Sequence, residues 1–341
     1  MGLKRVLGLA LVTLALASGL ANAGEGKFSG EVFGDMYWIA ADHDSAIEDL
    51  NGLWLRRINL THDYKFDDAF SSRVRLEAAT PGDFKSKDVM LVFIKDAWVK
   101  WTTGNQNVLV GLSPTPTWSL VEEMWGMRFM EKVPAELQRL GSSRDMGLAA
   151  TGSFDSGKKF GYHAMIGNGN GQVGEADAKK KGSLALRVRP TESWAFEVYG
   201  DYEDRVGSGD RQMVHGFVGY KTTSLRSGVQ YLRQLRKETG EDVELRILSA
   251  WLAAKMGEKA WAFARVDRNF DPNPEGSSIA YIPFDPTAAN TFVLAGIDFW
   301  VRETVGFSPN VEVVVYDDPD DSSLAKPDTD VIPRFTFHFT F

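Results

Sequence analysis

The spacing of the connections constrains this 341-residue chain more than any other feature. Segments in which apolar and polar residues alternate recur along it, at about 28–40, 53–65, 70–80, 89–101, 107–113, 144–153, 159–168, 182–190, 193–203, 211–221, 224–235, 244–256, 259–270, 290–301, 308–317 and 331–341. Even-numbered connections are short turns, and odd-numbered connections are mostly long loops. Short turns at one rim and long loops at the other are typical of bacterial outer-membrane barrels, whereas a soluble β-sandwich has no reason to alternate in this way. The sequence therefore predicts an all-β fold, a transmembrane antiparallel β-barrel of about sixteen strands.

The two faces of individual segments support this fold. The last segment places four phenylalanines on one side and polar residues on the other: Phe335, Phe337, Phe339 and Phe341 against Arg334, Thr336, His338 and Thr340. Segments 53–65, 70–80 and 182–190 also oppose apolar residues to charged or polar ones. Apolar-out, polar-in alternation is the pattern of a water-filled barrel. The terminal aromatic Phe341 is the usual form of the signal that the barrel assembly machinery recognises.

Two segments depart from clean alternation. Lys95 is in phase with Phe93 and Val99, which indicates a bulge in 89–101. In 259–270, Arg265 and Asp267 are in phase with aromatic residues, so the bounds there are less well defined. Aromatic residues near the expected strand ends fit the girdles at membrane interfaces: Trp38, Trp54, Trp101, Trp194, Tyr202, Tyr220, Tyr231, Trp300 and Tyr316.

Residues 1–23 have the form of a signal peptide, with Lys4 and Arg5, then apolar Val6–Leu16, then Ala21-Asn22-Ala23 as a cleavage site. The leader carries two basic and no acidic residues, so its removal changes the net charge from −8 to −10, which argues against a nucleic-acid partner. The chain contains no cysteine and no apolar stretch long enough for a transmembrane helix. We expect residues 24–341 to form one barrel domain in the bacterial outer membrane, in contact with lipid and lipopolysaccharide.

The stretch 113–144 interrupts the alternation. It opens with Ser113-Pro114-Thr115-Pro116, and the prolines block strand pairing. Leu120, Met124, Met127 and Met130 then follow with helix-like spacing, Pro134 breaks that run, and a second short turn is expected at Ala135–Leu140. Because the stretch is too apolar for a disordered tip, we expect it to fold into the barrel after strand five and constrict the lumen. An ordinary surface flap is the alternative.

The sequence resembles the phosphate-selective porins of the O/P type and their wider outer-membrane porin superfamily. The resemblance covers roughly residues 50–150 and rests on several motifs: Trp54–Leu60, Phe70–Glu77, Lys95–Trp98, Val110–Pro114, Phe129–Lys132 and Gly141–Gly147. It implies a sixteen-stranded, usually trimeric channel that is narrowed by the loop after strand five. The chain departs from the family by lacking an obvious lysine-rich external loop.

Charged residues on the wall and on the inserted stretch are the candidates for pore and constriction residues, because selectivity arises from side chains near the narrowest point. The candidate wall bases are Arg57, Arg73, Arg75, Arg187, Arg189, Arg226 and Arg246, with Glu77, Asp96, Glu197 and Asp201 as acidic partners. The inserted stretch contributes Glu122, Glu123, Arg128, Glu131, Lys132, Glu136 and Arg139. Arginines facing loop carboxylates would set a transverse field that sorts solutes by charge. A purely structural role in supporting the loop is the alternative.

Other motifs carry weaker signals, and we expect no catalytic residues, no cofactor and no metal site. Adjacent Glu122 and Glu123 point in different directions on a helix, which disfavours a catalytic pair. Asp42-His43-Asp44 is a weak metal motif when it stands alone in a loop. The acidic run 317–321 could hold divalent cations at the rim, although a solvated loop explains it as well.

The sequence therefore predicts a porin for passive diffusion of small hydrophilic solutes and ions, with preference for anions, phosphate among them, as a refinement. A general or cation-preferring porin is the nearest alternative, because the mature chain is acidic. An outer-membrane barrel enzyme or a structural barrel is more remote.

Overall fold

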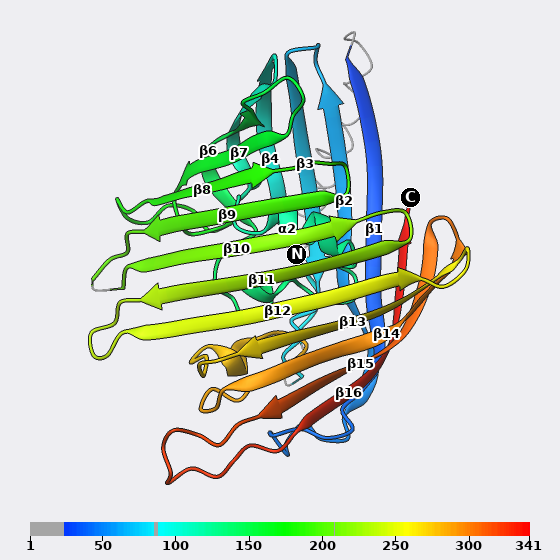
Figure 1. The fold of residues 1–341 in the computed structure, drawn as a ribbon, viewed down its shortest axis with the longest axis vertical. Helices are drawn as coiled ribbons and strands as arrows, with labels where there is room; N and C mark the ends of the chain where they lie inside the picture. Colours follow the sequence, from blue (N-terminus) through cyan, green and yellow to red (C-terminus); the bar gives the residue numbers. More distant parts are fainter. Residues whose placement is uncertain (1–23, 85–87, 208) are drawn as a thin grey trace, which may run out of the picture.

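The computed structural model describes residues 24–84, 88–207 and 209–341, and the expected leader, 1–23, lies outside the described residues. Sixteen antiparallel strands form a closed barrel in which each pairs with its neighbours in sequence and β1 pairs with β16 (Figure 1). The strands are β1 (Glu25–Trp38), β2 (Asn51–Lys65), β3 (Phe70–Ala79), β4 (Leu91–Thr103), β5 (Gln106–Pro114), β6 (Arg144–Ser153), β7 (Phe160–Gly167), β8 (Lys181–Val188), β9 (Trp194–Glu203), β10 (Arg211–Lys221), β11 (Leu225–Arg236), β12 (Val243–Lys255), β13 (Ala260–Asn269), β14 (Asn290–Arg302), β15 (Val305–Tyr316) and β16 (Asp330–Thr340). The predicted fold class is confirmed, and the predicted strand ends lie within three residues of the observed ones.

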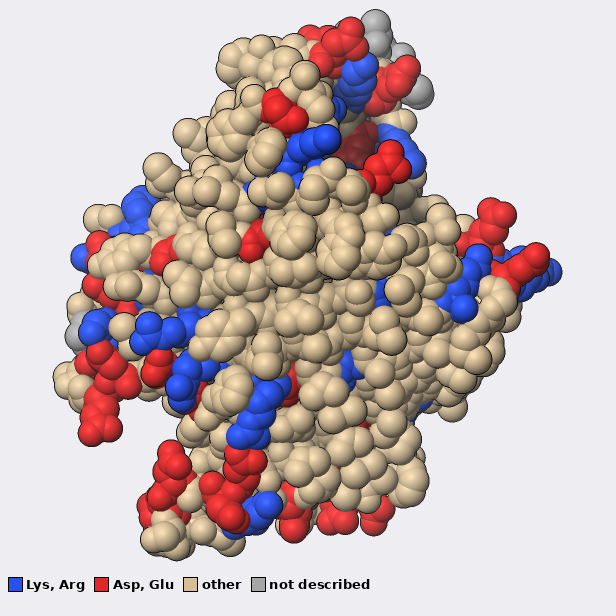
Figure 2. Space-filling view, in the orientation of Figure 1, with Lys and Arg blue, Asp and Glu red and all other residues tan. Residues whose placement is uncertain are grey.

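The outer face of the barrel is apolar. Val74, Leu184 and Phe335 are exposed on it, as the alternation predicted. Figure 2 shows a largely uncharged surface over the strands that face the viewer, with charged side chains gathered towards the edges. No helix among the described residues is long and apolar enough to cross a membrane.

Two bulges place charged side chains inside the barrel that strict alternation would send outward. Between β1 and β2 the register shifts at Phe33/Gly34, and the extra residue on β2 is Arg56. Between β3 and β4 it shifts at Arg75/Leu76, and the extra residue on β4 is Lys95. The bulge predicted near Lys95 is thereby confirmed. Because a bulge sets two residues against one, Arg56 points inward beside Arg57, and Lys95 beside Asp96.

The stretch between β5 and β6 folds into the barrel, as predicted. It contains α2 (Ser119–Trp125) and α3 (Pro134–Leu137). Gly126 adopts a left-handed φ of 64° and ends α2, so Met127 and Met130 lie beyond the helix that their spacing suggested. Pro134 was expected to end the helix-like pattern, and it also begins α3. Proline is tolerated in the first turn of a helix, because the N–H that it lacks would have no partner within the helix there.

The apolar side of this stretch packs against the inner face of the wall from β8 to β16. The ring of Trp125 lies edge-on to Trp251 and Phe263, with centroids 5.9 and 6.3 Å away. This packing explains why β13 alternates poorly: Phe263 faces the inserted stretch, so both faces of the strand carry apolar residues. Wall residues in the shared core include Ala185, Tyr199, Met213, Phe217, Leu232, Leu245, Phe292 and Val314.

A second segment also turns inward. The connection between β13 and β14 was expected to be an ordinary long loop, but Ile279, Ile282 and Phe284 are buried in the same core as the stretch between β5 and β6. The Tyr281 hydroxyl donates to the carbonyl of Thr80, 2.7 Å away on the loop after β3. The short 3-10 helix η2 (Gly276–Ser278) shapes the turn. The two inward segments therefore support each other inside the barrel.

Three of the expected girdle aromatics are placed differently. Trp54 donates its indole N–H to the inward carboxylate of Asp35. Trp300 lies 4.6 Å from the inward ring of His338. Tyr316 is buried, and its hydroxyl donates to Asp330. The indole N–H of Trp54 and the hydroxyl of Tyr316 each have a hydrogen-bond acceptor inside the barrel, which an outward orientation would not supply. Trp38, Trp101, Trp194, Tyr202 and Tyr231 are exposed as predicted.

Candidate functional site: the charged lining of the barrel

The charged edge of the inserted stretch faces the wall formed by β2, β3, β4 and β6. Arg128 extends from the stretch to Glu136, with Nη2 and Oε1 2.8 Å apart, and to Glu122, with Nε and Oε2 3.7 Å apart. On the wall, Arg57 pairs with Glu77 at 3.1 Å and lies 3.7 Å from Glu136. Arg57 therefore connects the barrel wall to the inserted stretch.

The same wall carries further ion pairs. Lys95 lies 3.4 Å from Glu77. Asp96 is shared by two arginines, Arg75 at 3.4 Å and Arg144 at 2.5 Å. We call these residues the arginine cluster; its five bases are Arg57, Arg75, Lys95, Arg128 and Arg144, and its four carboxylates are Glu77, Asp96, Glu122 and Glu136. The cluster thus has an excess of one positive charge.

The bases and the carboxylates of the cluster differ in their access to water. The side chains of its four arginines are between 16% and 24% exposed, whereas those of Glu77, Asp96 and Glu136 are 3%, 0% and 12% exposed. The four guanidinium groups are therefore more accessible to water than Glu77, Asp96 and Glu136, whereas Glu122, at 39%, is the most exposed member of the cluster.

Burial and neighbouring charge act in opposite directions on the carboxyl of Glu136. Burial alone would raise its pKa, but the guanidinium groups of Arg128 and Arg57 outweigh that effect and lower the pKa to about 2. Glu136 is therefore ionised at neutral pH and holds Arg128 in place. Lys132, beyond the cluster, has its pKa lowered to about 8 by burial, and its Nζ lies 5.8 Å from the ring centroid of Tyr281.

The opposite wall, from β8 to β11, holds the first helix of the inserted stretch. Arg189 pairs with Glu123 at 2.7 Å. Arg226 donates to the carbonyl of Gly126 at 3.1 Å, and Lys221 donates to the carbonyl of Glu123 at the same distance. Arg187 lies nearby and pairs with the fully buried Glu197 at 2.5 Å. Arg189 and Arg226 thus support the loop, which was the structural alternative for the wall arginines.

Glu131 lies at the centre of a buried network on the side of β1, β2 and β16. It accepts hydrogen bonds from Arg56 at 3.2 Å and from Arg334 at 3.3 Å. Arg56 also pairs with Asp35 at 2.6 Å, and Arg334 pairs with Glu312 at 2.7 Å. None of these groups is open to water, so Glu131 fixes the inserted stretch and does not line the open interior.

Three further expected pore residues, Arg73, Arg139 and Arg246, also lie away from the arginine cluster. Arg73 forms a two-pronged pair with Asp63, at 2.6 and 2.9 Å, close to the short turn between β2 and β3. The Nε atom of Arg139 lies 4.0 Å from Oε2 of Glu275, a residue of the second inward segment. Arg246 pairs with Asp271 at the long-loop rim, and its neighbours Leu245 and Ile247 are the residues that point inward. The expectation that Arg246 lines the lumen is wrong, because the pleat of β12 turns it outward.

Sequence reasoning did not place Arg56, Lys95 and Arg144 among the pore candidates. Bulges turn Arg56 and Lys95 inward. The phase of Lys95 with Phe93 and Val99 indicated its bulge, whereas the only signal for Arg56 is the adjacent polar residue Arg57. Arg144 was recognised only as part of a motif at the start of a strand. Its role depends on Asp96, which is 48 positions away.

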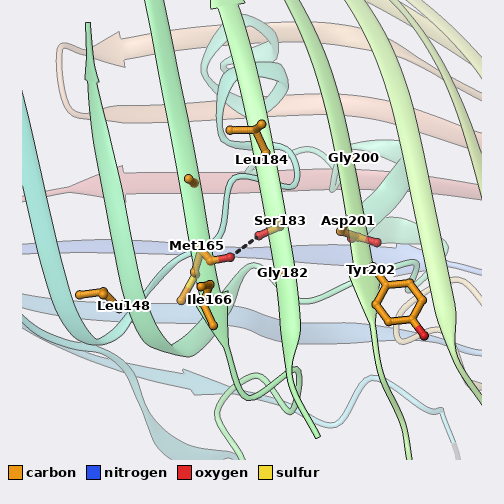
Figure 3. Close-up of a pocket in the computed structure, with 10 residues that line it drawn as sticks. Leu148, Met165, Ile166, Gly182, Ser183, Leu184, Gly200, Asp201 and Tyr202 are labelled. Atoms are coloured by element: carbon orange, nitrogen blue, oxygen red, sulfur yellow. Dashed lines mark hydrogen bonds between the residues drawn. The ribbon is translucent and has the colours of Figure 1, made fainter.

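A hollow on the outer surface was not expected. It has a volume of about 500 Å³ and lies over β6 to β9, where exposed Leu148, Ile166 and Leu184 surround Gly182 and Gly200 (Figure 3). A Cβ placed on Gly182 would meet no atom within 4 Å, so the absence of a side chain there helps to create the hollow. Asp201 is the one charged residue among those that line the hollow, and its carboxylate pairs with Lys181 at 3.0 Å.

Comparisons with known proteins agree with the fold. No family model matches the chain, and no curated protein sequence matches it. Among solved structures, the anion-selective porin from Comamonas acidovorans superposes with a TM-score of 0.70 at 11% identity, over 93% of this chain and 100% of that one. OmpF of Salmonella typhi, in a complex with daunomycin, gives a TM-score of 0.65 at 11% identity over 92% and 97%. A trimer form of OmpT, an outer-membrane protein of Vibrio cholerae, gives 0.63 at 13% over 94% and 100%. At these identities the likeness concerns the fold alone.

Proposed function

We propose that this protein is an outer-membrane channel for passive diffusion of small hydrophilic solutes and ions, and that it prefers anions. The barrel is closed, its outer face is apolar and its interior is charged, which is the arrangement of a water-filled transmembrane barrel. The structures that it resembles in fold include an anion-selective porin.

One observation carries the anion preference: the guanidinium groups of the arginine cluster are more exposed than three of its four carboxylates, Glu77, Asp96 and Glu136. A solute that passes the cluster therefore meets Arg57, Arg75 and Arg144 at closer range than their acidic partners. Guanidinium groups suit carboxylates and phosphates because they offer a planar fork of N–H donors. Charged side chains near a constriction set selectivity, so the excess positive charge favours anions.

A general or cation-preferring porin remains the alternative, and specific carboxylates favour it. Glu122 and Glu123 are the more exposed acids of the inserted stretch, at 39% and 52%. Both have basic neighbours, since Arg128 lies 3.7 Å from Glu122 and Arg189 lies 2.7 Å from Glu123. We therefore assign them less influence than the arginines. Phosphate is one anion that the arginines suit, and the interior geometry does not single it out from other oxyanions.

Assembly and location follow from the same proposal. The exposed apolar belt suits lipid, and long loops at one rim suit contact with lipopolysaccharide on the outer side. A homotrimer is proposed because one protein of similar fold is described as a trimer form. The last strand, β16, presents Phe335 outward and ends beside the terminal Phe341, which suits recognition by the barrel assembly machinery.

The test is the reversal potential of the purified, untagged protein in a planar bilayer under a KCl gradient. We expect stepwise conductance. We also expect the sign of the reversal potential to show that chloride is more permeant than potassium. The triple variant Arg57→Gln, Arg75→Gln, Arg144→Gln removes three of the five bases, and we expect it to lower the chloride-to-potassium permeability ratio roughly three- to tenfold. Replacing the same three residues by lysine keeps the charge and should keep most of the preference.

The matched control is Arg246→Gln, because Arg246 is an arginine at the long-loop rim on the outward side of its strand. Heat-modifiable mobility in gel electrophoresis would show that each variant is folded. A reversal potential that shows cation selectivity in the unaltered protein would indicate that Glu122 and Glu123 determine the ion selectivity. A folded protein without conductance would overturn the channel proposal.

A further inference from the structure

Residues from the two ends of the chain meet at the rim of long loops. Asp42 and His43 lie on the loop after β1, and Asp330 is the first residue of β16. The two segments are held together by backbone hydrogen bonds between Ala41 and Val331. Figure 1 shows the loop after β1 beside the start of β16, at the seam where the barrel closes.

The ligand-type atoms of these three residues are close together. The Nδ1 atom of His43 lies 2.9 Å from Oδ1 of Asp330 and 3.4 Å from Oδ1 of Asp42. One such atom from each residue can be chosen so that all three lie within 4.8 Å of one another. Two ligand atoms that each lie ~2.0–2.2 Å from one ion in a tetrahedral site are ~3.3–3.6 Å apart, which is comparable with the two His43 distances.

The carboxylates of this cluster are buried, unlike those of a solvated acidic loop. Asp42 and Asp330 are 4% and 1% exposed. The Oδ2 atom of Asp42 is buried and accepts no hydrogen bond from any described residue. Two carboxylates held this close out of water are unfavourable unless a cation compensates them.

We propose that Asp42, His43 and Asp330 bind one divalent transition-metal ion, such as Zn²⁺. The donor set of one imidazole nitrogen and two carboxylate oxygens suits Zn²⁺ and related ions, whereas Ca²⁺ and Mg²⁺ favour oxygen donors alone. The side chain of His43 is 10% exposed, so the site has access to solvent. A fourth position would be open to water or another ligand.

A second layer of contacts orients these ligands. The Tyr316 hydroxyl donates to Oδ2 of Asp330 at 2.6 Å and lies 3.2 Å from Nδ1 of His43. The backbone N–H of Asp285 donates to the Tyr316 oxygen at 3.1 Å. Such outer partners are a regular feature of metal sites, because they fix the orientation of the ligands. They also link the site to the second inward segment.

The sequence alone pointed to a triplet of Asp42, His43 and Asp44 and gave it little weight. The structure replaces Asp44 by Asp330, which is 287 positions from His43. Asp44 instead accepts a hydrogen bond from the backbone N–H of Ala46. A bound ion would fasten the loop after β1 to the last strand and so stabilise the seam between β1 and β16.

The test uses untagged protein stripped with EDTA and then titrated with Zn²⁺. We expect one tightly held Zn²⁺ per chain after desalting, a higher unfolding temperature with Zn²⁺ than without, and a visible spectrum of a nitrogen- and oxygen-ligated ion when Co²⁺ is used. His43→Gln and Asp330→Asn should each weaken Zn²⁺ binding at least ~10-fold. The control is Asp321→Asn, which removes an exposed carboxylate from the loop between β15 and β16 and should leave binding unchanged.

Two results would overturn the proposal. One is the absence of retained Zn²⁺ in the folded, unaltered protein, which would leave the cluster as a hydrogen-bonded His–Asp pair. The other is equal binding by the folded His43→Gln variant, which would place the ion elsewhere. Neither result bears on the conductance of the channel, so the two proposals are tested separately.

Discussion

Glu131 and Arg334 are 203 positions apart in the chain, yet Oε2 of Glu131 lies 3.3 Å from Nη1 of Arg334 inside the barrel. The first residue belongs to the inserted stretch after β5, and the second belongs to the last strand. Arg56, displaced inward by the bulge in β2, contacts the same carboxylate at 3.2 Å. The contacts of Glu131 are therefore complete only when β2 and β16 are both in place.

This relationship predicts that Glu131→Gln will loosen the inserted stretch. Removing one partner from a buried ion pair costs about 3–5 kcal/mol, because it leaves the other charge uncompensated. Arg56 and Arg334 would retain Asp35 and Glu312, which limits the loss. We expect a larger and noisier single-channel conductance together with a lower unfolding temperature.

The matched control is Glu123→Gln on the same stretch. Its pair with Arg189 is exposed, and exposed pairs contribute only about 0–1 kcal/mol. Conductance noise in the Glu123→Gln channel should therefore match that of the unaltered protein. Equal effects of the two substitutions would show that Glu131 does not hold the stretch in place.

The second inward segment provides another prediction. Phe284 is fully buried in the core shared by the two inward segments, and its ring centroid is 6.2 Å from that of Phe292 on β14. Phe284→Ala should destabilise this core by about 3–5 kcal/mol. We expect a lower unfolding temperature and faster proteolysis between β13 and β14. Phe154→Ala at an exposed turn should change the stability by less than about 0.5 kcal/mol; a similar loss in both variants would contradict the assignment.

The strands could be predicted from the sequence because the two faces of a water-filled transmembrane barrel meet different surroundings. Residues that face lipid are apolar and residues that face the interior are polar, so the two kinds alternate along each strand. Phe335 and Arg334 show this directly, since the first is exposed on the outer face and the second is buried inside. The inserted stretch could be predicted for a related reason. Its prolines prevent pairing, and its apolar residues require burial.

The interior contacts could not be predicted in the same way. The inward position of Arg56 depends on one extra residue in β2. A shift of one residue turns the side chains that follow it to the opposite face of the strand. The sharing of Asp96 by Arg75 and Arg144 depends on which strands lie side by side and in which register. The inward turn of residues 279–284 depends on the space left beside the first inserted stretch.

The pH dependence of stability should reveal the role of Glu136. Its pKa in the folded protein, about 2, lies below the ordinary value of 4.5, because Arg128 and Arg57 outweigh the effect of burial. A carboxyl group with a lowered pKa contributes stability above its unfolded pKa and loses that contribution as pH falls through the folded value. The unfolding temperature of the unaltered protein should therefore fall more steeply between about pH 4.5 and 2 than that of Glu136→Gln. Parallel profiles for the two proteins would contradict the assignment.

The absence of cysteine from the chain allows a direct test of which arginines meet the solute. In Arg144→Cys the new thiol would lie at an arginine that is 16% exposed to the interior. A negatively charged thiol reagent should lower the permeability to chloride further, and a positively charged reagent should restore it. The measurement is the reversal potential before and after each reagent. Arg246→Cys, at the rim on the outward side of β12, is the control: its thiol should react without a change in ion preference, because a charge there is screened by solvent over about 8 Å at physiological salt. If the reagents changed ion preference only in the Arg246→Cys channel, selectivity would be set at the rim and not at the arginine cluster.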